Sequence, residues 1–279
     1  MRGDTLDKME FCAQGDIFPI SVKEYLHILG FSVTLVKTVK YRGLFLNGEQ
    51  VTVRATVSEG DVLTVCLPDE VSENIEPMDI PLKAVYEDEY LAVFDKPTNM
   101  PTHPSKGNNL PTLANAVMGR YRGKFVFRAI TRLDRDTSGL VLIAKDRISA
   151  YALSEDMKSG KIKKEYRALV TGIPKEKSGV INAPIRRVCE GEIKRGVFPD
   201  GKPAVTEYRV SEIRGENALC EINLLTGRTH QIRVHMAHIG HPLIGDFLYG
   251  EREAGEYFLR CHRLTFYHPI TKELIILEV

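Results

Sequence analysis

The string TRLDRDTSG, which begins at Thr131, holds the residue types from which chemistry is most readily expected. It places Asp134 between Arg132 and Arg135, just before an apolar run at residues 140–144 that is expected to form a buried strand. Gly139, at the entry of this strand, indicates a close backbone approach. Nearby positive charge favours the ionised form of a carboxyl group, so Asp134 is expected to be a carboxylate. A firmly held carboxylate can act as a nucleophile or as a general base. An arbitrary acid between arginines is more often a surface ion pair, and the rest of the chain decides between these interpretations.

Further downstream, three segments combine aromatic, hydroxyl and cationic side chains. They are KEYRALVTG at 164–172, GKPAVTEY at 201–208, and TGRTHQIRVH at 226–235 with GHPLIGD at 240–246. Together with the Asp134 string, these ordered motifs resemble the signature of RluA-class pseudouridine synthases. DKP at 95–97 and HPS at 103–105 are similar to the opening segment of that family. Several ordered motifs are far more specific than any single one.

The resemblance implies roles for individual residues. Asp134 falls on the catalytic aspartate of the family, Tyr166 on its active-site tyrosine, and Arg233 on the arginine that the family places against the aspartate. A guanidinium can hold a carboxylate with two hydrogen bonds, which lysine cannot copy. One position departs from the pattern, because Thr131 stands where His is usual.

The implied reaction breaks the bond from C1′ to N1 of a uridine and joins C1′ to C5 of the same uracil. No redox change occurs and no group is lost, so neither a cofactor nor a metal is required in principle. Whether Asp134 attacks as a nucleophile or removes a proton stays open. A stacked uridine must be extruded before it can react, and Arg132 is a candidate to fill the gap. Arg228, Thr229 and His230, near a helix start, are candidates to bind phosphate.

Other interpretations were weighed against this one. A zinc site from His230, His235, His238 and His241 lacks a cysteine at ligand spacing. Paired Asp134 and Asp136 would suit a hydrolase, but no third acid or metal motif lies near them in the sequence. An RNA-binding assembly factor without catalysis would not need the Asp134, Tyr166 and Arg233 set, and a nuclease would need a metal site or a paired histidine.

Composition narrows the class of partner and the compartment. The 279 residues are 43% hydrophobic with a formal net charge of +1, which argues against a purely electrostatic RNA binder but permits a locally basic cleft. Five scattered cysteines without a C-x-x-C pair indicate a reduced, cytoplasmic compartment. No signal peptide or membrane-spanning stretch is evident. We expect a monomer whose partner is RNA.

The chain divides into two expected parts. Residues 1–70 form a small αβ module, with a helix from Ser21 to Gly30, a second one near 35–39, and an Asn-Gly hairpin at 44–51. This order is similar to the S-four-type RNA-binding domain of a ribosomal protein. Residues 68–80 have the composition of a linker.

Residues 81–279 are expected to form the catalytic domain. Strands are expected at 90–94, 204–210 and 218–224, with helices at 146–160 and from Thr229 to Gly240. Arg233 would project from the second helix, which is a rigid support. Helices interrupt the strands irregularly, so the fold class is α+β with a mixed, largely antiparallel sheet. The resemblance implies a central catalytic cleft.

Overall fold

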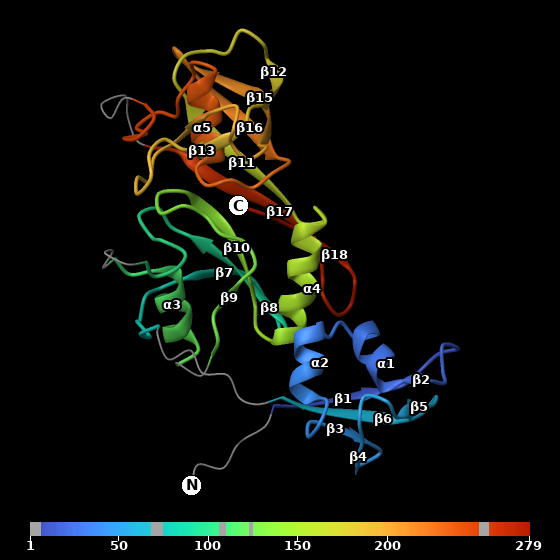
Figure 1. The fold of residues 1–279 in the computed structure, drawn as a ribbon. Coiled ribbons are helices and arrows are strands. Elements are labelled where there is room, and N and C mark those ends of the chain that lie inside the picture. Colours follow the sequence, from blue (N-terminus) through green and yellow to red (C-terminus); the bar gives the residue numbers. More distant parts are fainter. Residues whose placement is uncertain (1–6, 68–74, 106–109, 123–124, 251–256) are drawn as a thin grey trace.

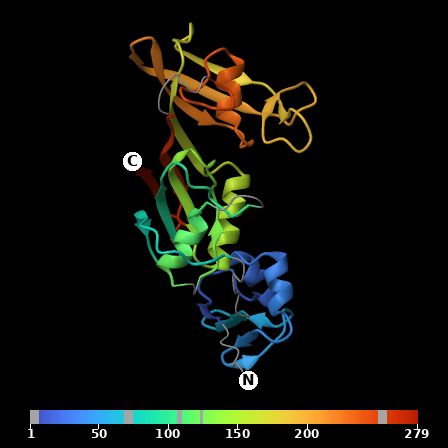
Figure 2. The ribbon, with the colours of Figure 1, turned by 90° about the vertical axis from the view of Figure 1, so that its left-hand side faces the viewer.

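Two parts of different size follow each other along the chain in the computed structural model, which describes residues 7–67, 75–105, 110–122, 125–250 and 257–279. The small N-terminal part lies at one end of an elongated molecule, and the large part extends away from it (Figures 1 and 2). Of the predicted linker at 68–80, residues 68–74 fall outside the described residues.

The small part combines two helices with short strands. Its elements are β1 (Asp7–Cys12), β2 (Ile20–Ser21), α1 (Val22–Ile28), α2 (Val33–Val39), β3 (Leu44–Leu46), β4 (Glu49–Gln50), β5 (Thr56–Val57) and β6 (Val62–Leu67). The sheet order is β1-β6-β3-β4, and β2 pairs with β5. Ser21 and Glu24 form a reciprocal cap at the start of α1. Asn47 and Gly48 both have positive φ in the turn between β3 and β4, which confirms the Asn-Gly hairpin.

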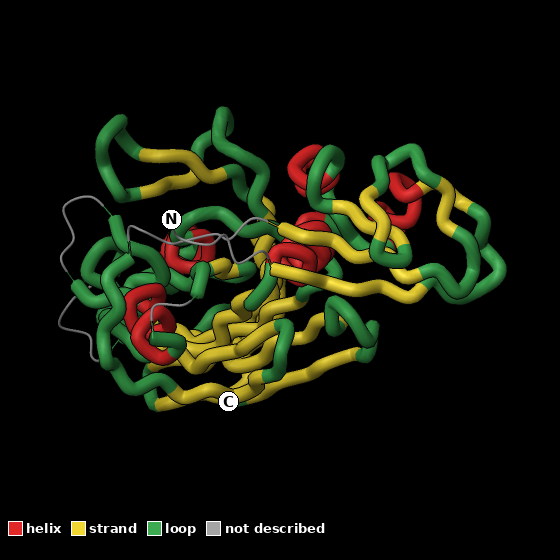
Figure 3. The backbone as a smooth tube through the Cα atoms, turned by 90° about the horizontal axis from the view of Figure 1, so that it is seen from below, coloured by secondary structure: helices red, strands yellow, loops and turns green. Residues whose placement is uncertain are grey.

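Among its described residues, the large part contains a ten-stranded sheet with three helices. Its elements are β7 (Lys83–Glu87), β8 (Leu91–Lys96), α3 (Leu113–Arg120), β9 (Arg128–Ala129), β10 (Ser138–Ala144), α4 (Arg147–Lys158), β11 (Lys163–Val170), β12 (Ser178–Asn182), β13 (Ile185–Arg187), β14 (Arg195–Val197), β15 (Val205–Arg214), β16 (Asn217–Leu224), α5 (Gln231–His238), β17 (Leu259–Tyr267) and β18 (Leu274–Glu278). Viewed from below, the strands cross the middle of the molecule and the helices are seen nearly end-on (Figure 3).

The strand order is β12-β15-β16-β11-β17-β10-β8-β7, with β18 on β17 and β9 on β10; β13 and β14 form a separate hairpin. Every pair is antiparallel except the short parallel contact between β10 and β17. This confirms the α+β class and the largely antiparallel sheet. The parallel contact joins two half-sheets, one containing β7 to β10 and the other containing β11 to β18 without the hairpin.

Gly139 makes the contact between the half-sheets possible. It pairs with Cys261, and a Cβ atom built on Gly139 would lie 2.1 Å from the Cys261 carbonyl oxygen. Its φ of +110° is also a conformation that favours glycine. The close backbone approach expected of a glycine at this strand entry is therefore present.

Both predicted helices of the large part are present, but only one of them starts at the predicted residue. Asp146 caps α4 by accepting hydrogen bonds from the backbone N–H groups of Ile148 and Ser149, as the predicted start at 146 requires. The helix predicted from Thr229 begins later, at Gln231. His230 is in the left-handed conformation, with φ of 58°, so the helix cannot extend through it.

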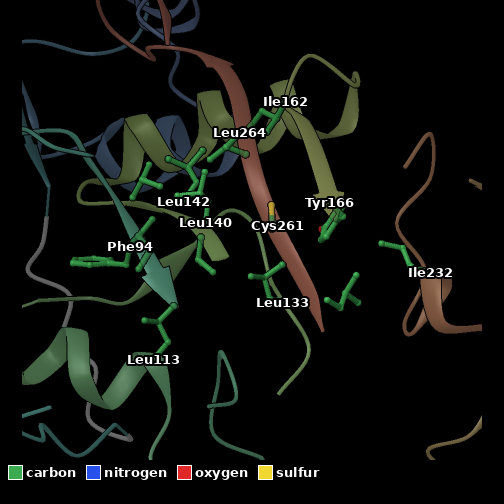
Figure 4. Packing of buried hydrophobic residues seen from close by; sticks show 14 of the residues in the cluster. Phe94, Leu113, Leu133, Leu140, Leu142, Ile162, Tyr166, Ile232, Cys261 and Leu264 are labelled. Atoms are coloured by element: carbon green, nitrogen blue, oxygen red, sulfur yellow. The ribbon is translucent and has the colours of Figure 1, made fainter. Parts of the chain in front are cut away.

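Two main hydrophobic cores accompany the two parts. The larger one is built on β8, β10, β11 and β17, and Figure 4 shows Tyr166, Cys261 and Leu133 within it. The smaller one gathers apolar side chains of the N-terminal part, including Leu26 and Phe31. One residue of the large part, Ile148 at the start of α4, is buried in this smaller core.

Candidate active site

A cavity of about 310 Å³ lies against the junction of the two half-sheets and α5. Its lining includes all seven side chains that the sequence pattern marks, namely Arg132, Asp134, Tyr166, Arg228, Thr229, His230 and Arg233. These residues come from the loop before β10, from β11, and from the segment at the start of α5. The fold thus brings together motifs that are about 100 positions apart in the sequence.

Asp134 lies in a tight turn directly before β10. The Thr137 backbone N–H donates a hydrogen bond of 3.2 Å to the Asp134 carbonyl, which closes the turn. The Asp134 side chain is 36% exposed and faces the cavity. It is therefore open to a substrate.

A buried lysine, Lys96, is hydrogen-bonded to the backbone of the turn that carries Asp134. The Lys96 ammonium is fully buried and donates hydrogen bonds to the carbonyls of Pro97, Met100 and Arg135, at 2.9, 2.7 and 3.1 Å. Burial lowers the pKa of Lys96 to about 8, although Asp136 and Asp134 oppose this effect. The backbone that carries Asp134 is thereby fixed on one side.

Thr131, at the position where the family usually has His, serves the backbone. Its side chain is 1% exposed, and its hydroxyl accepts a hydrogen bond of 2.9 Å from the Leu142 N–H. This anchors the loop to β10, and it leaves the neighbouring Arg132 side chain exposed at the cavity.

Arg233 does not make the hydrogen bonds that the sequence predicted. We expected its guanidinium to hold Asp134 with two hydrogen bonds, and it instead holds Asp246, with Nε to Oδ2 at 2.7 Å and Nη2 to Oδ1 at 2.6 Å. Both partners are buried, at 3% and 0% exposure. The sequence could not show this because Asp246, in the GHPLIGD string, is an equally suitable acid.

The Arg233–Asp246 pair is enclosed by aromatic rings. The guanidinium carbon lies 5.4, 5.0 and 5.7 Å from the ring centres of Phe247, Tyr249 and Tyr257. Burial is the largest single effect and by itself would lower the pKa of Arg233, but the hydrogen bonds to Asp246 and the charge interactions with Tyr257 and Asp246 together outweigh it and raise the pKa above its usual value. The charge of Asp134 adds to this effect at longer range. Arg233 is thus a permanent cation in the cavity wall.

Tyr166 projects from β11 toward the cavity. Figure 4 shows it on the side of Cys261 that faces Ile232 of α5. The side chain is 4% exposed, and burial raises the pKa of its hydroxyl well above the usual value, with a smaller contribution from Cys261. Tyr166 therefore stays neutral and presents an aromatic surface.

The three residues predicted to bind phosphate differ from one another. Arg228 and Thr229 are exposed, and the Arg228 Nε donates to the Pro203 carbonyl at 2.9 Å. His230 turns inward instead. Its Nδ1 lies 2.8 Å from the Tyr249 hydroxyl, and its Nε2 lies 4.0 Å from Asp134 Oδ2.

Sequence reasoning assigned no role to Lys164 of the KEYRALVTG string, which lines the same cavity. Burial lowers the pKa of Lys164, opposed by Cys261 and Asp134. No ion pair or side-chain hydrogen bond engages its ammonium among the residues that the structure describes. Its place two residues before Tyr166, on the same face of a strand, was the available signal.

Three of the four histidines considered for zinc have protein partners, His230 among them, and the fourth, His238, is exposed. His235 is fully buried, with Nδ1 2.8 Å from the Thr206 hydroxyl and Nε2 2.9 Å from the Ala183 carbonyl. His241 Nδ1 lies 2.9 Å from the Thr171 carbonyl. Within the described ranges, no three His, Cys, Asp or Glu side chains are grouped so that they could hold a metal ion.

The chain matches known proteins over most of its length. Residues 90–238 match the family described as RNA pseudouridylate synthase. "Uncharacterized RNA pseudouridine synthase YjbO" of Bacillus subtilis (strain 168) is 41% identical over 262 residues, which cover 91% of this chain and 93% of that relative. "Ribosomal large subunit pseudouridine synthase D" of Pasteurella multocida (strain Pm70) is 38% identical over 266 residues, covering 88% and 82%.

A solved structure agrees with these relatives. That of human RNA Pseudouridylate Synthase Domain Containing 1 has a TM-score of 0.62 and 27% identity, covering 74% of this chain and 86% of that one. The chain therefore belongs to the RNA pseudouridylate synthase family, in its RluA class. It is an RNA pseudouridine synthase, and hence an isomerase, as the motifs predicted. No helix among the described residues has the length and apolar character needed to cross a membrane.

Proposed function

We propose that this synthase isomerises specific uridines in structured ribosomal or transfer RNA, with Asp134 as the essential group. The observation that carries the proposal is the meeting of Asp134, Tyr166 and Arg233 in one cavity. Its volume of about 310 Å³ is within the range of sites that hold a small ligand. A single extruded nucleotide is a ligand of that kind.

Each side chain then has a distinct task. Asp134 acts on the ribose or on the uracil, either as a nucleophile or as a general base, since its carboxylate is exposed to the cavity. Tyr166 stacks on the uracil ring, because it is neutral and rigidly held. Arg233, fixed by Asp246, supplies a permanent positive charge in the cavity wall that acts on Asp134 without a direct hydrogen bond.

Extrusion of the target leaves a gap in the RNA. Arg132 is exposed at the cavity rim beside Asp134, and the described residues offer it no ion-pair partner. A planar guanidinium can stack between bases and contact the backbone, so we assign Arg132 to the gap. Arg228 and Thr229, which also line the cavity and are exposed, are assigned to phosphate.

We assign a supporting role to the small N-terminal part. The S-four-type module is predicted for residues 1–70 and the catalytic domain for residues 81–279. In this proposal the catalytic domain binds RNA near the target uridine, and the module binds the same RNA farther from it. Lys37, Lys40 and Arg42 lie on or just after α2 and provide cations for this contact. We further propose that the chain is a monomer and that it acts in the cytoplasm. Sedimentation of the purified chain tests the monomeric state.

Mapping pseudouridine in RNA from cells with and without this chain tests the function. Large-subunit ribosomal RNA is examined first, because relatives carry that RNA in their names. We expect a specific site to disappear and to return with the wild-type chain but not with Asp134→Asn. If no site changes, or if the Asn variant restores the site, the proposal is wrong. If the Asn variant cures a ribosome assembly defect without restoring pseudouridine, an assembly role is favoured.

A further inference from the structure

His230 has a backbone conformation that is uncommon for a residue other than glycine. It is not glycine, yet its φ of 58° lies in the left-handed region, immediately before α5. Such residues cluster at functional sites, because the surrounding structure must hold them there. The effect of this conformation is to turn the imidazole into the cavity, where its side chain is only 13% exposed.

The Tyr249 hydroxyl determines which imidazole nitrogen carries the proton. Its oxygen accepts a hydrogen bond of 2.9 Å from the backbone N–H of Arg195, at the start of β14. The phenol has one proton to donate, and among the described residues His230 Nδ1, at 2.8 Å, is the acceptor within its reach. Nδ1 is therefore unprotonated, and the proton of the neutral ring is on Nε2.

The neutral form of His230 is the one that the surroundings favour. Burial lowers the pKa of His230, and this outweighs the opposing effect of Asp134. The other charged groups that act on the ring oppose one another, with Arg233 and Arg195 lowering the pKa and Asp246 raising it. His230 can donate a hydrogen bond from Nε2 and has no additional proton to give.

The Nε2–H group faces the Asp134 carboxylate. The distance from Nε2 to Oδ2 is 4.0 Å, which is longer than a hydrogen bond. Hydrogen bonds of this kind are often long before substrate binds and shorten in the complex. Closure by about 1 Å would bring the two atoms within hydrogen-bond distance.

We propose that His230 is a positioning residue for Asp134, and that Tyr249 fixes the tautomer in which it acts. The Nε2–H group holds one carboxylate oxygen, so the other points to the extruded nucleotide. This inference rests on the proposed role of Asp134. It replaces the predicted role of His230 as a phosphate contact.

Four variants test the proposal on an RNA in which the wild-type chain has already been shown to form pseudouridine. Failure of the proposed function is thus detected before any variant is made. The variants are His230→Leu, His230→Gln, Tyr249→Phe and the double variant His230→Leu/Tyr249→Phe. His238→Gln is the control, since His238 is exposed on the last turn of the same helix. Single-turnover rates at saturating RNA and dissociation constants are measured for each.

We expect His230→Leu to lower the single-turnover rate roughly 10- to 100-fold, as a misplaced catalytic group does. His230→Gln keeps an N–H donor and should recover part of this loss. Tyr249→Phe should slow turnover, and the double variant should be no slower than His230→Leu, because the two side chains act as one unit. RNA affinity should stay within about twofold of wild type throughout, well under the tenfold that 1.4 kcal/mol would cause.

Three results would overturn the proposal. The first is wild-type turnover by His230→Leu. The second is a defect in affinity alone with a reduced salt dependence, which would make His230 a phosphate contact. The third is additive losses in the double variant, which would show that Tyr249 does not act through His230. Thermal unfolding checks that each variant folds, and if His230→Leu does not fold, the Gln and Phe variants decide by the same criteria.

Discussion

The two half-sheets that meet at the cavity contribute to it in opposite ways. The half with β7 to β10 supplies one loop, on which Asp134 and Arg132 both reach solvent. The half with β11 and β17 supplies Tyr166, and α5 above it supplies Arg233; both side chains are less than 5% exposed. The two side chains of the first side are accessible, and these two side chains of the other side are enclosed.

The difference separates reacting groups from shaping groups. A charged group that already has two short hydrogen bonds, as Arg233 has with Asp246, gains little from a substrate. Asp134 has no partner closer than 4.0 Å among the ion pairs of the described residues, so its carboxylate is available for chemistry. Substitutions on the accessible side should therefore change turnover with little change in stability, and those on the enclosed side should change both.

The largest effect is expected for Asp134→Asn. The amide has nearly the same shape, so folding and RNA binding should stay near wild type while turnover falls below about a hundredth. Tritium release from RNA labelled at C5 of uridine measures turnover, and filter binding measures affinity. Activity above that level would count heavily against Asp134 as the essential group.

Arg233→Lys should come next, with turnover lowered about 100-fold. The charge remains, but an ammonium cannot hold both oxygens of Asp246, and the cavity wall should shift.

Asp246→Ala leaves a buried cation without its partner and should lower the free energy of unfolding by about 3–5 kcal/mol. Single-turnover assays and denaturant unfolding measure the two effects. Normal turnover by Arg233→Lys would contradict the shaping role of Arg233, and a purely salt-sensitive loss of affinity would indicate a phosphate contact instead.

Arg228→Ala should have a smaller effect of a different kind. Arg228 is exposed, so its loss should weaken RNA affinity, reduce the salt dependence by a slope of about one, and leave the single-turnover rate at saturation unchanged. Filter binding across a salt series is the measurement. A slower chemical step with normal affinity would contradict the assignment and move Arg228 to the shaping side.

EDTA should have no effect on turnover. The chemistry of isomerisation needs no metal, and His230, His235 and His241 are engaged by protein groups. The assay must use an RNA that folds without magnesium, because magnesium also folds RNA. Loss of activity in EDTA that zinc restores would be inconsistent with this view of the site.

Much of the fold followed from local sequence signals. Asp146 at a helix start, the Asn47-Gly48 turn and the apolar run of β10 each depend on a few neighbouring residues, and each formed as predicted. Strand β1 had no such signal. It is defined by its pairing with β6, which lies about 50 residues further along the chain.

The seven predicted residues gather at one cavity, but Lys164 was missed and the pairing within the cavity was not predicted. Motifs placed all seven residues in one cavity, yet the acid that binds Arg233 was misassigned. The choice between Asp134 and Asp246 depends on distances of a few ångströms, which spacing along the chain does not determine. The inward turn of His230 was also hidden, because a left-handed histidine has no signature in the sequence.

Ile148 has a consequence for how the enzyme is dissected. It begins α4 of the large part but is buried in the core of the small one, with its Cγ2 3.5 Å from the Cβ position of Gly30. In a fragment that lacks residues 1–67, the Ile148 side chain would be exposed to solvent at the start of α4. This exposed apolar side chain favours self-association of the fragment. Self-association would lower the apparent RNA affinity even if the small part made no contact with RNA. Charge-reversal at Lys37 or Lys40, on the surface of the intact chain, is therefore the cleaner way to learn what the small part contributes.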